Sequence, residues 1–215
     1  MINSRTYLLV IAFALIGGGL VGCSHNIPVT PSAQSIQTGN KIPLEVALIL
    51  SDQLKTYQHS ENKFGDTWVY SNLGQASAEH YRNVLESRFQ KVTLVGSAID
   101  SVSGNSQSFA AILDPKIAGF TFDIPFTKFQ VYPATIRYTM TAFSPNKEII
   151  YSNTLNGVGD SQGSPGFDFA ANPSKSATKA VEDGVRLSVE DLINSSAFKQ
   201  LLENKHKTPQ TQKEL

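Results

Sequence analysis

The alternation of apolar and polar positions predicts several β-strands. In IPLEVALILS, residues 42–51, every second residue from Leu44 to Leu50 is apolar and lies on one face of an extended chain. KVTLVGS, residues 91–97, is expected to form a short strand. FAAILDPKIAGFTFDI, residues 109–124, is also strand-like, with a bend at Pro115 because proline cannot donate a hydrogen bond to a sheet.

The clearest alternation lies in ATIRYTMTAF, residues 134–143, where Tyr138 and its apolar neighbours at every second position predict one buried face and one wet face. The turn sequence SPNKE follows, and IIYSNTL, residues 149–155, returns. These segments therefore predict an antiparallel hairpin.

Apolar residues at helical spacing predict two main helices. In SAEHYRNVLESRF, residues 77–89, the apolar positions fall on one helical face. A longer helix is expected to begin at Asn172 and Pro173, which suit an N-cap and a first helical turn. AFKQLLEN, residues 197–204, adds a short terminal helix. The inner stripe of the long helix is expected to be Ala177, Val181, Gly184, Val185, Ser188 and Leu192.

This order of elements predicts an α+β fold, in which two main helices pack on one face of a mixed, mostly antiparallel sheet. The domain is expected over residues 42–203. Residues 23–41 are polar and contain prolines, so they are predicted to form a flexible tether that holds the domain about 20 to 25 Å from its attachment point. Residues 204–215 are expected to be a disordered tail.

Residues 1–22 have the pattern of a secretory signal peptide. Arg5 precedes an apolar block from Tyr7 to Ile16, and three glycines follow. A retained membrane span is the alternative, but it needs roughly 20 apolar residues, and this block has about half that number. The segment is therefore predicted to be removed.

The only cysteine of the chain, Cys23, follows this segment directly. Leu20, Val21, Gly22 and Cys23 resemble a bacterial lipobox, and the alternative is a buried free thiol. The resemblance implies cleavage before Cys23, acylation of its thiol with chains such as palmitate, and anchoring of the domain to a membrane. Because Ser24 is not Asp, the resemblance also implies the outer membrane, with the domain in the periplasm.

Composition narrows the class of protein further. The 215 residues have 40% hydrophobic content, 17% charged content and a formal net charge of zero, which is typical of a globular domain. This balance argues against a nucleic-acid partner, which would favour a basic surface. Without a second cysteine the domain has no disulfide, so its stability must come from its core.

Motifs for catalysis or metal binding are weak, and no cofactor is predicted. GDSQG, residues 159–163, matches the nucleophile elbow of hydrolases with Ser161 as nucleophile, but Pro165 and Gly166 occupy the place where a helix should begin. A Ser161-dependent hydrolase is therefore a distant alternative to a simple loop. No two of the four histidines have the spacing of metal ligands. They are His25, His59, His80 and His206.

The segment IAGFTFDIPFTKFQVYP is rich in aromatic residues, and core packing is the simplest interpretation of it. Exposed rings here would instead form a contact site for a partner or for lipid. The candidate contact residues are Phe120, Phe122, Phe126, Phe129 and Tyr132. The long loop between Asn156 and Asn172 is a second place where function is expected.

In its order of strands and helices, the chain loosely resembles envelope lipoproteins of the transport-auxiliary and lipopolysaccharide-assembly type and the amino-terminal domain of the Tol-system periplasmic protein. Three segments together also resemble a group of proteobacterial lipoproteins without assigned activity: residues 43–50, FGDTWVYSNLG and FAAILDPKI. The resemblance implies a non-enzymatic protein that acts as a binding or accessory subunit of an envelope complex. An envelope protein is then the expected partner, and a homo-oligomer is compatible with this role. The alternative is an auxiliary lipoprotein that contacts lipid or glycolipid during transport.

Overall fold

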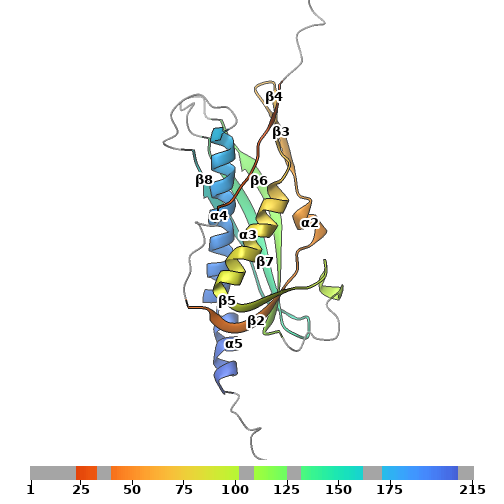
Figure 1. Ribbon diagram of the computed structural model, residues 1–215, viewed down its shortest axis with the longest axis vertical. Helices are drawn as coiled ribbons and strands as arrows, with labels where there is room; N and C mark the ends of the chain where they lie inside the picture. The colour runs from red at the N-terminus through yellow and green to blue at the C-terminus, as the bar shows by residue number, and fades with distance from the viewer. Residues whose placement is uncertain (1–22, 33–39, 102–108, 125–131, 162–170, 208–215) are drawn as a thin grey trace, which may run out of the picture.

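The computed structural model describes residues 23–32, 40–101, 109–124, 132–161 and 171–207 (Figure 1). Its fold is α+β with mixed, mostly antiparallel sheets, as the sequence predicts. A five-stranded main sheet has the order β5-β2-β6-β7-β8. Its strands are β2 (Ile42–Leu48), β5 (Phe89–Leu94), β6 (Ala111–Phe122), β7 (Ala134–Phe143) and β8 (Ile149–Gly159).

Strand β2 pairs in parallel with β5 and β6, whereas β6, β7 and β8 form a long antiparallel meander. The predicted hairpin of β7 and β8 is confirmed, and β8 extends beyond its predicted end to Gly159. Every second residue of β7 is buried, which matches its apolar alternation.

The predicted bend at Pro115 is wrong, because β6 continues through it and instead has an irregularity between Ile117 and Gly119. The amide of Ile49 donates to the carbonyl of Leu113, so the peptide groups of Leu113 and of every second residue after it face β2. Strand β2 pairs with β6 only as far as Leu113. Pro115 therefore has no ladder partner to lose on that side.

Two main helices, α3 (Leu73–Arg88) and α4 (Ala171–Asn194), lie next to each other on one face of this sheet (Figure 1). The predicted inner stripe of α4 is buried along its whole length. A Cβ atom at Gly157 of β8 would lie only 2.2 Å from the carbonyl oxygen of Ala180 and 2.4 Å from the Cα of Gly184. Glycine at both positions therefore allows helix and sheet backbones to touch.

A second, three-stranded sheet lies at one end of the molecule, with the order β1-β4-β3. Its strands are β1 (Ser24–Asn26), β3 (His59–Lys63) and β4 (Asp66–Tyr70). The short helix α2 (Asp52–Lys55) lies between β2 and β3, and a 3-10 turn, η2 (Ile99–Ser101), follows β5. Helix α5 (Ser196–Lys207) extends from the opposite end (Figure 1).

The predicted flexible tether is wrong for residues 23–32. Ile27 and Val29 are buried, and the amide of Val29 donates to the side chain of Asn72, which donates back to the carbonyl of Val29. The amides of Thr30 and Ser32 bond to side chains of α4. Apolar burial and these hydrogen bonds outweigh the flexibility that the polar, proline-containing sequence indicates.

The predicted tail is also too long, because residues 204–207 belong to α5, while residues 208–215 lie outside the described part. In the portion of the chain that the structure describes, no helix is long and apolar enough to cross a membrane.

Candidate functional site

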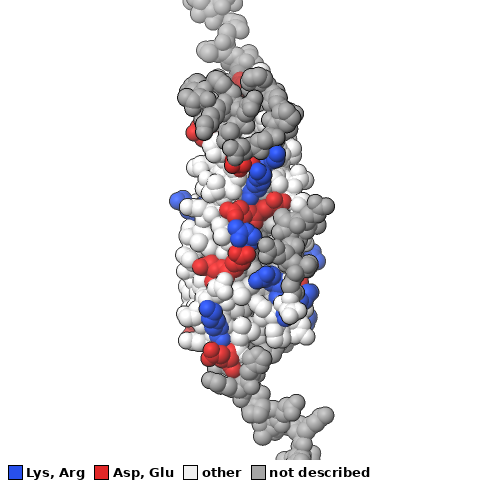
Figure 2. All heavy atoms as spheres, turned by 90° about the vertical axis from the view of Figure 1, so that its left-hand side faces the viewer, with Lys and Arg blue, Asp and Glu red and all other residues white. Residues whose placement is uncertain are grey.

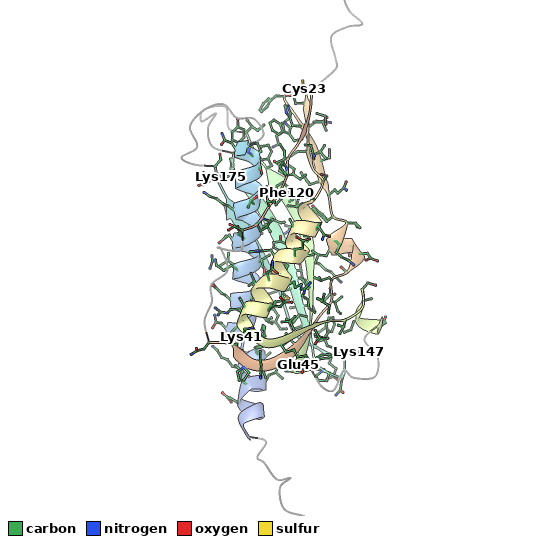
Figure 3. The ribbon with its side chains drawn as sticks, viewed as in Figure 1. Cys23, Lys41, Glu45, Phe120, Lys147 and Lys175 are labelled. Atoms are coloured by element: carbon green, nitrogen blue, oxygen red, sulfur yellow. The ribbon has the colours of Figure 1, made fainter. Side chains whose placement is uncertain are left out.

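Cys23 lies at the end of the long axis that carries the small sheet (Figure 3). Its backbone N–H donates to Asp66 Oδ1 at 3.0 Å, and its carbonyl oxygen accepts from the amide of Thr67 at 2.9 Å. The residue is exposed. Cys23 is therefore held by the fold through its backbone, while it remains open to solvent.

The carboxylate of Asp66 connects this residue with β1. His25 Nε2 lies 3.0 Å from Asp66 Oδ2, where the ring N–H donates, and the other oxygen accepts from Cys23. The hydrogen bond from His25, followed by that from Cys23, lowers the pKa of Asp66 below its ordinary value. Asp66 is therefore ionised at neutral pH and binds the first residues of the described chain.

Aromatic rings fill the space under the small sheet. His25 stacks on Trp68 with a centroid separation of 4.4 Å, and Trp68 lies 5.5 Å from Phe122. We call the following rings the aromatic layer: His25, Trp68, Tyr70, Phe120, Phe122 and Tyr132. Because β6 contributes two of these rings, the layer fixes the small sheet to the end of the main sheet.

Strand β3 places charged groups against this layer. His59 Nε2 lies 3.5 Å from Glu61 Oε1, and Lys63 Nζ lies 3.6 Å from Glu61 Oε2 and 3.5 Å from Asp123 Oδ1. Burial, and then the charge of Glu61, raises the pKa of Tyr70 far above its ordinary value. Lys63 is thus compensated by two carboxylates, and Tyr70 stays neutral.

The turn between β3 and β4 projects from this end of the molecule. Phe64 and Gly65 form it, with φ angles of 56° and 87°, as a two-residue hairpin turn of the mirror-image type requires. Phe64 is 61% exposed, although its residue type usually avoids both water and positive φ. We call Phe64 and Gly65 the hairpin tip.

Three of the five aromatic candidates lie in the core, which agrees with the simpler interpretation of their segment and not with a contact site. Phe120, Phe122 and Tyr132 are at most 5% exposed and belong to the core, so they do not form a contact surface for a partner or lipid. The physical reason is that β4 and β1 cover the end of β6. Phe126 and Phe129 lie outside the described residues.

Ser161 is not arranged as a nucleophile. It is fully buried, and its hydroxyl oxygen accepts a hydrogen bond from the amide of Tyr132 at 3.1 Å. It follows β8, an antiparallel strand at the edge of the sheet, whereas a nucleophile elbow follows a parallel strand and exposes its hydroxyl. Its observed contact is structural, linking the end of β8 to the start of β7.

The described residues contain no cluster of three or more side chains that could hold a metal ion. His80 is buried in α3, and burial lowers its pKa, so it is neutral. Acidic and basic side chains alternate along the face of α4 shown in Figure 2, with Arg186 bonded to both Asp183 and Glu190. Charges on this face compensate one another, which gives no attraction for a ligand of one sign.

Sequence reasoning missed β1 and the hairpin of β3 and β4. The dipeptide Phe64-Gly65 carries a signal for a tight turn only through its glycine, since Asn or Asp is usual at the first position. The three-residue strand β1 has no periodicity to detect. Its partners, Thr67 to Val69, are distant in sequence.

No family model matches the chain, and no curated protein matches it. Among solved structures, it is similar to protein XCC0632 of Xanthomonas campestris, of family DUF330, with a TM-score of 0.46, 13% identity, and coverage of 85% of this chain and 98% of that one. It is also similar to a Helicobacter pylori protein described as a neuraminyllactose-binding hemagglutinin homolog, with a TM-score of 0.45, 10% identity, and coverage of 83% and 98%.

A third similar structure is lipoprotein GNA1162 from Neisseria meningitidis, with a TM-score of 0.35, 9% identity, and coverage of 71% of this chain and 100% of that one. The structures similar to this chain thus include a protein described as a lipoprotein. At these identities and TM-scores, none of the similarities carries an argument about function.

Proposed function

We propose that this chain is an outer-membrane lipoprotein, acylated at Cys23, whose domain acts without catalysis as a binding or accessory subunit in the cell envelope. One observation carries the proposal: the cysteine that completes the lipobox is exposed at one end of the folded domain. Modification of its thiol would displace no core side chain.

The mechanism of such a protein is positional. Each buried methylene of an acyl chain contributes about 0.8 kcal/mol, and more than one chain makes attachment effectively permanent. Confinement to a thin layer at the membrane raises the effective concentration of the domain towards envelope partners. The domain needs only a binding surface for this role.

Two alternatives lose support from the geometry. A transport role through the aromatic segment depends on exposed rings, and Phe120, Phe122 and Tyr132 are buried. The other two candidates, Phe126 and Phe129, lie outside the described residues. A hydrolase depended on Ser161, which is also buried.

The anchor is tested with Cys23→Ala in the full-length chain. Cells are fed a labelled palmitate analogue, and we expect the variant to lose the label and to accumulate with residues 1–22 still attached. Ser24→Asp is the matched control, because it keeps the cysteine and should retain the label while moving the protein to the inner-membrane fraction. Label retained by Cys23→Ala would contradict the anchor.

The accessory role is tested by photo-crosslinking in cells from positions far from the hairpin tip. Ile149 and Leu94 are 66% and 49% exposed, so each can carry a crosslinking residue without disturbing the core. A discrete protein adduct at either position supports a protein partner. Crosslinks to lipid alone would favour the transport alternative.

A further inference from the structure

We infer that the hairpin tip, Phe64 and Gly65, is a membrane-contact site that inserts into the same bilayer that holds the acylated Cys23. The inference rests on the proposed function, because it requires acylation of Cys23. The occupant of the site is a lipid bilayer.

The register of the small sheet gives the direction of the tip. Strands β1 and β4 are parallel, with Ser24 opposite Thr67, so Cys23 lies beside Asp66. Gly65 and Phe64 precede Asp66 in the chain, just as residues 22 and 21 precede Cys23. Because β1 and β4 are parallel, the chain before Asp66 and the chain before Cys23 leave the small sheet on the same side. At roughly 3.3 Å per residue, the tip therefore extends past the cysteine backbone on the side where the mature chain would begin.

Acylation then sets the depth of this end. A thioether-linked glyceride is short, so a modified Cys23 must lie close to the glycerol level of the bilayer. The cysteine cannot move away from the tip without loss of its bonds to Asp66 and Thr67, because residues 24–32 are also tied to the fold. The ring of Phe64 thus reaches the depth at which interfacial aromatic side chains bury.

The chemistry of the tip suits that position. Phe64 is 61% exposed, and transfer of its apolar surface from water into lipid is favourable. The charged groups nearest to it are paired: Asp66 binds His25 and the Cys23 amide, and Lys63 lies between Glu61 and Asp123. No single-sign cluster is present here among the described residues, so the contact is expected to be apolar and to need no anionic lipid.

Ile149, another exposed apolar residue, does not share this geometry. Ile149 is 66% exposed, but it follows the turn that contains Lys147, which lies towards the opposite end of the molecule from Cys23 (Figure 3). It is therefore a matched control of similar exposure. Asp123, within 3.5 Å of Lys63, gives a position set back from the tip.

The test uses the full lipidated protein in vesicles of phosphatidylcholine that contain a lipid with a spin label on its acyl chain. In an acylated chain Cys23 has no free thiol, so Phe64→Cys, Asp123→Cys and Ile149→Cys each introduce the only reactive one. Each is labelled with an environment-sensitive fluorophore, and circular dichroism confirms folding. We expect quenching at residue 64 about twofold or more above that at residue 149, with an intermediate value at residue 123.

Equal quenching at residues 64 and 149, or no quenching at residue 64, would overturn the inference. The Asp123→Cys protein keeps Phe64 and Gly65 unchanged, so quenching at residue 123 no higher than at residue 149 would overturn it as well. Intact mass separates the two proposals. An acylated protein without quenching at 64 overturns the membrane contact alone, whereas a protein without acyl mass overturns the anchor and the contact together.

Discussion

The main sheet and the small sheet of this protein are stabilised by different kinds of contact. Under α3 and α4, long strands present continuous apolar faces, and the helix backbone touches the sheet at Gly157. The small sheet consists of short strands held by the aromatic layer, by paired charges and by the segment that begins at Cys23. The end of the molecule that we propose to face the membrane is thus held by contacts between segments that are distant in sequence.

This difference has an energetic consequence. In the described part of the chain, the small sheet contains two buried polar atoms without a hydrogen-bond partner, Trp68 Nε1 and Tyr70 Oη, on strands of only three to five residues. Each such group costs about 1 to 3 kcal/mol relative to a satisfied one. The small sheet should therefore open before the main sheet does, as is common for functional regions.

The largest effect is expected from a methyl group at the contact between helix and main sheet. Gly157→Ala would place a Cβ 2.2 Å from the carbonyl of Ala180, and we expect a loss of about 3 kcal/mol or more in free energy of unfolding. Gly65→Ala meets no atom within 4 Å and suffers only from its φ of 87°, so about 1 kcal/mol is expected. Urea denaturation measures the free energy of unfolding of both variants. Equal losses would contradict the expected difference between the contact of helix with main sheet and the hairpin tip.

A smaller effect tests whether the segment after Cys23 belongs to the fold. Ile27 is fully buried, so Ile27→Ala should cost about 2 kcal/mol in free energy of unfolding. Val158→Ala, at a position 57% exposed, is the control and should change stability by less than about 0.5 kcal/mol. If the two variants unfold at the same urea concentration, residues 23–32 are a tether after all.

The smallest effect concerns the pH dependence of the small sheet. The pKa of Asp66 is lower in the folded protein than its ordinary value, so its contribution is present above about pH 4 and is lost as pH falls through the folded pKa. Protection of the Thr67 amide from hydrogen exchange should therefore decrease in acid relative to the main sheet. In Asp66→Ala this protection should be low at every pH, and an acid-insensitive wild-type protein would refute the role of Asp66.

The sequence by itself determined those elements of the protein in which many nearby residues favour burial of the same face. The alternation in residues 134–143 and the stripe from Ala177 to Leu192 specify strand and helix because each apolar position independently favours the same buried face. The resemblance of residues 20–23 to a lipobox is equally local, since these four residues are contiguous.

Only the tertiary structure decided the arrangement at the Cys23 end. Nothing local to Ile27 indicates that it is buried, and nothing local to Phe64 distinguishes an exposed ring from a core one. Both outcomes depend on the parallel pairing of β1 with β4, which joins residues more than forty positions apart. A sequence pattern records what each residue prefers, whereas the direction in which a tip projects depends on which distant segments finally pack together.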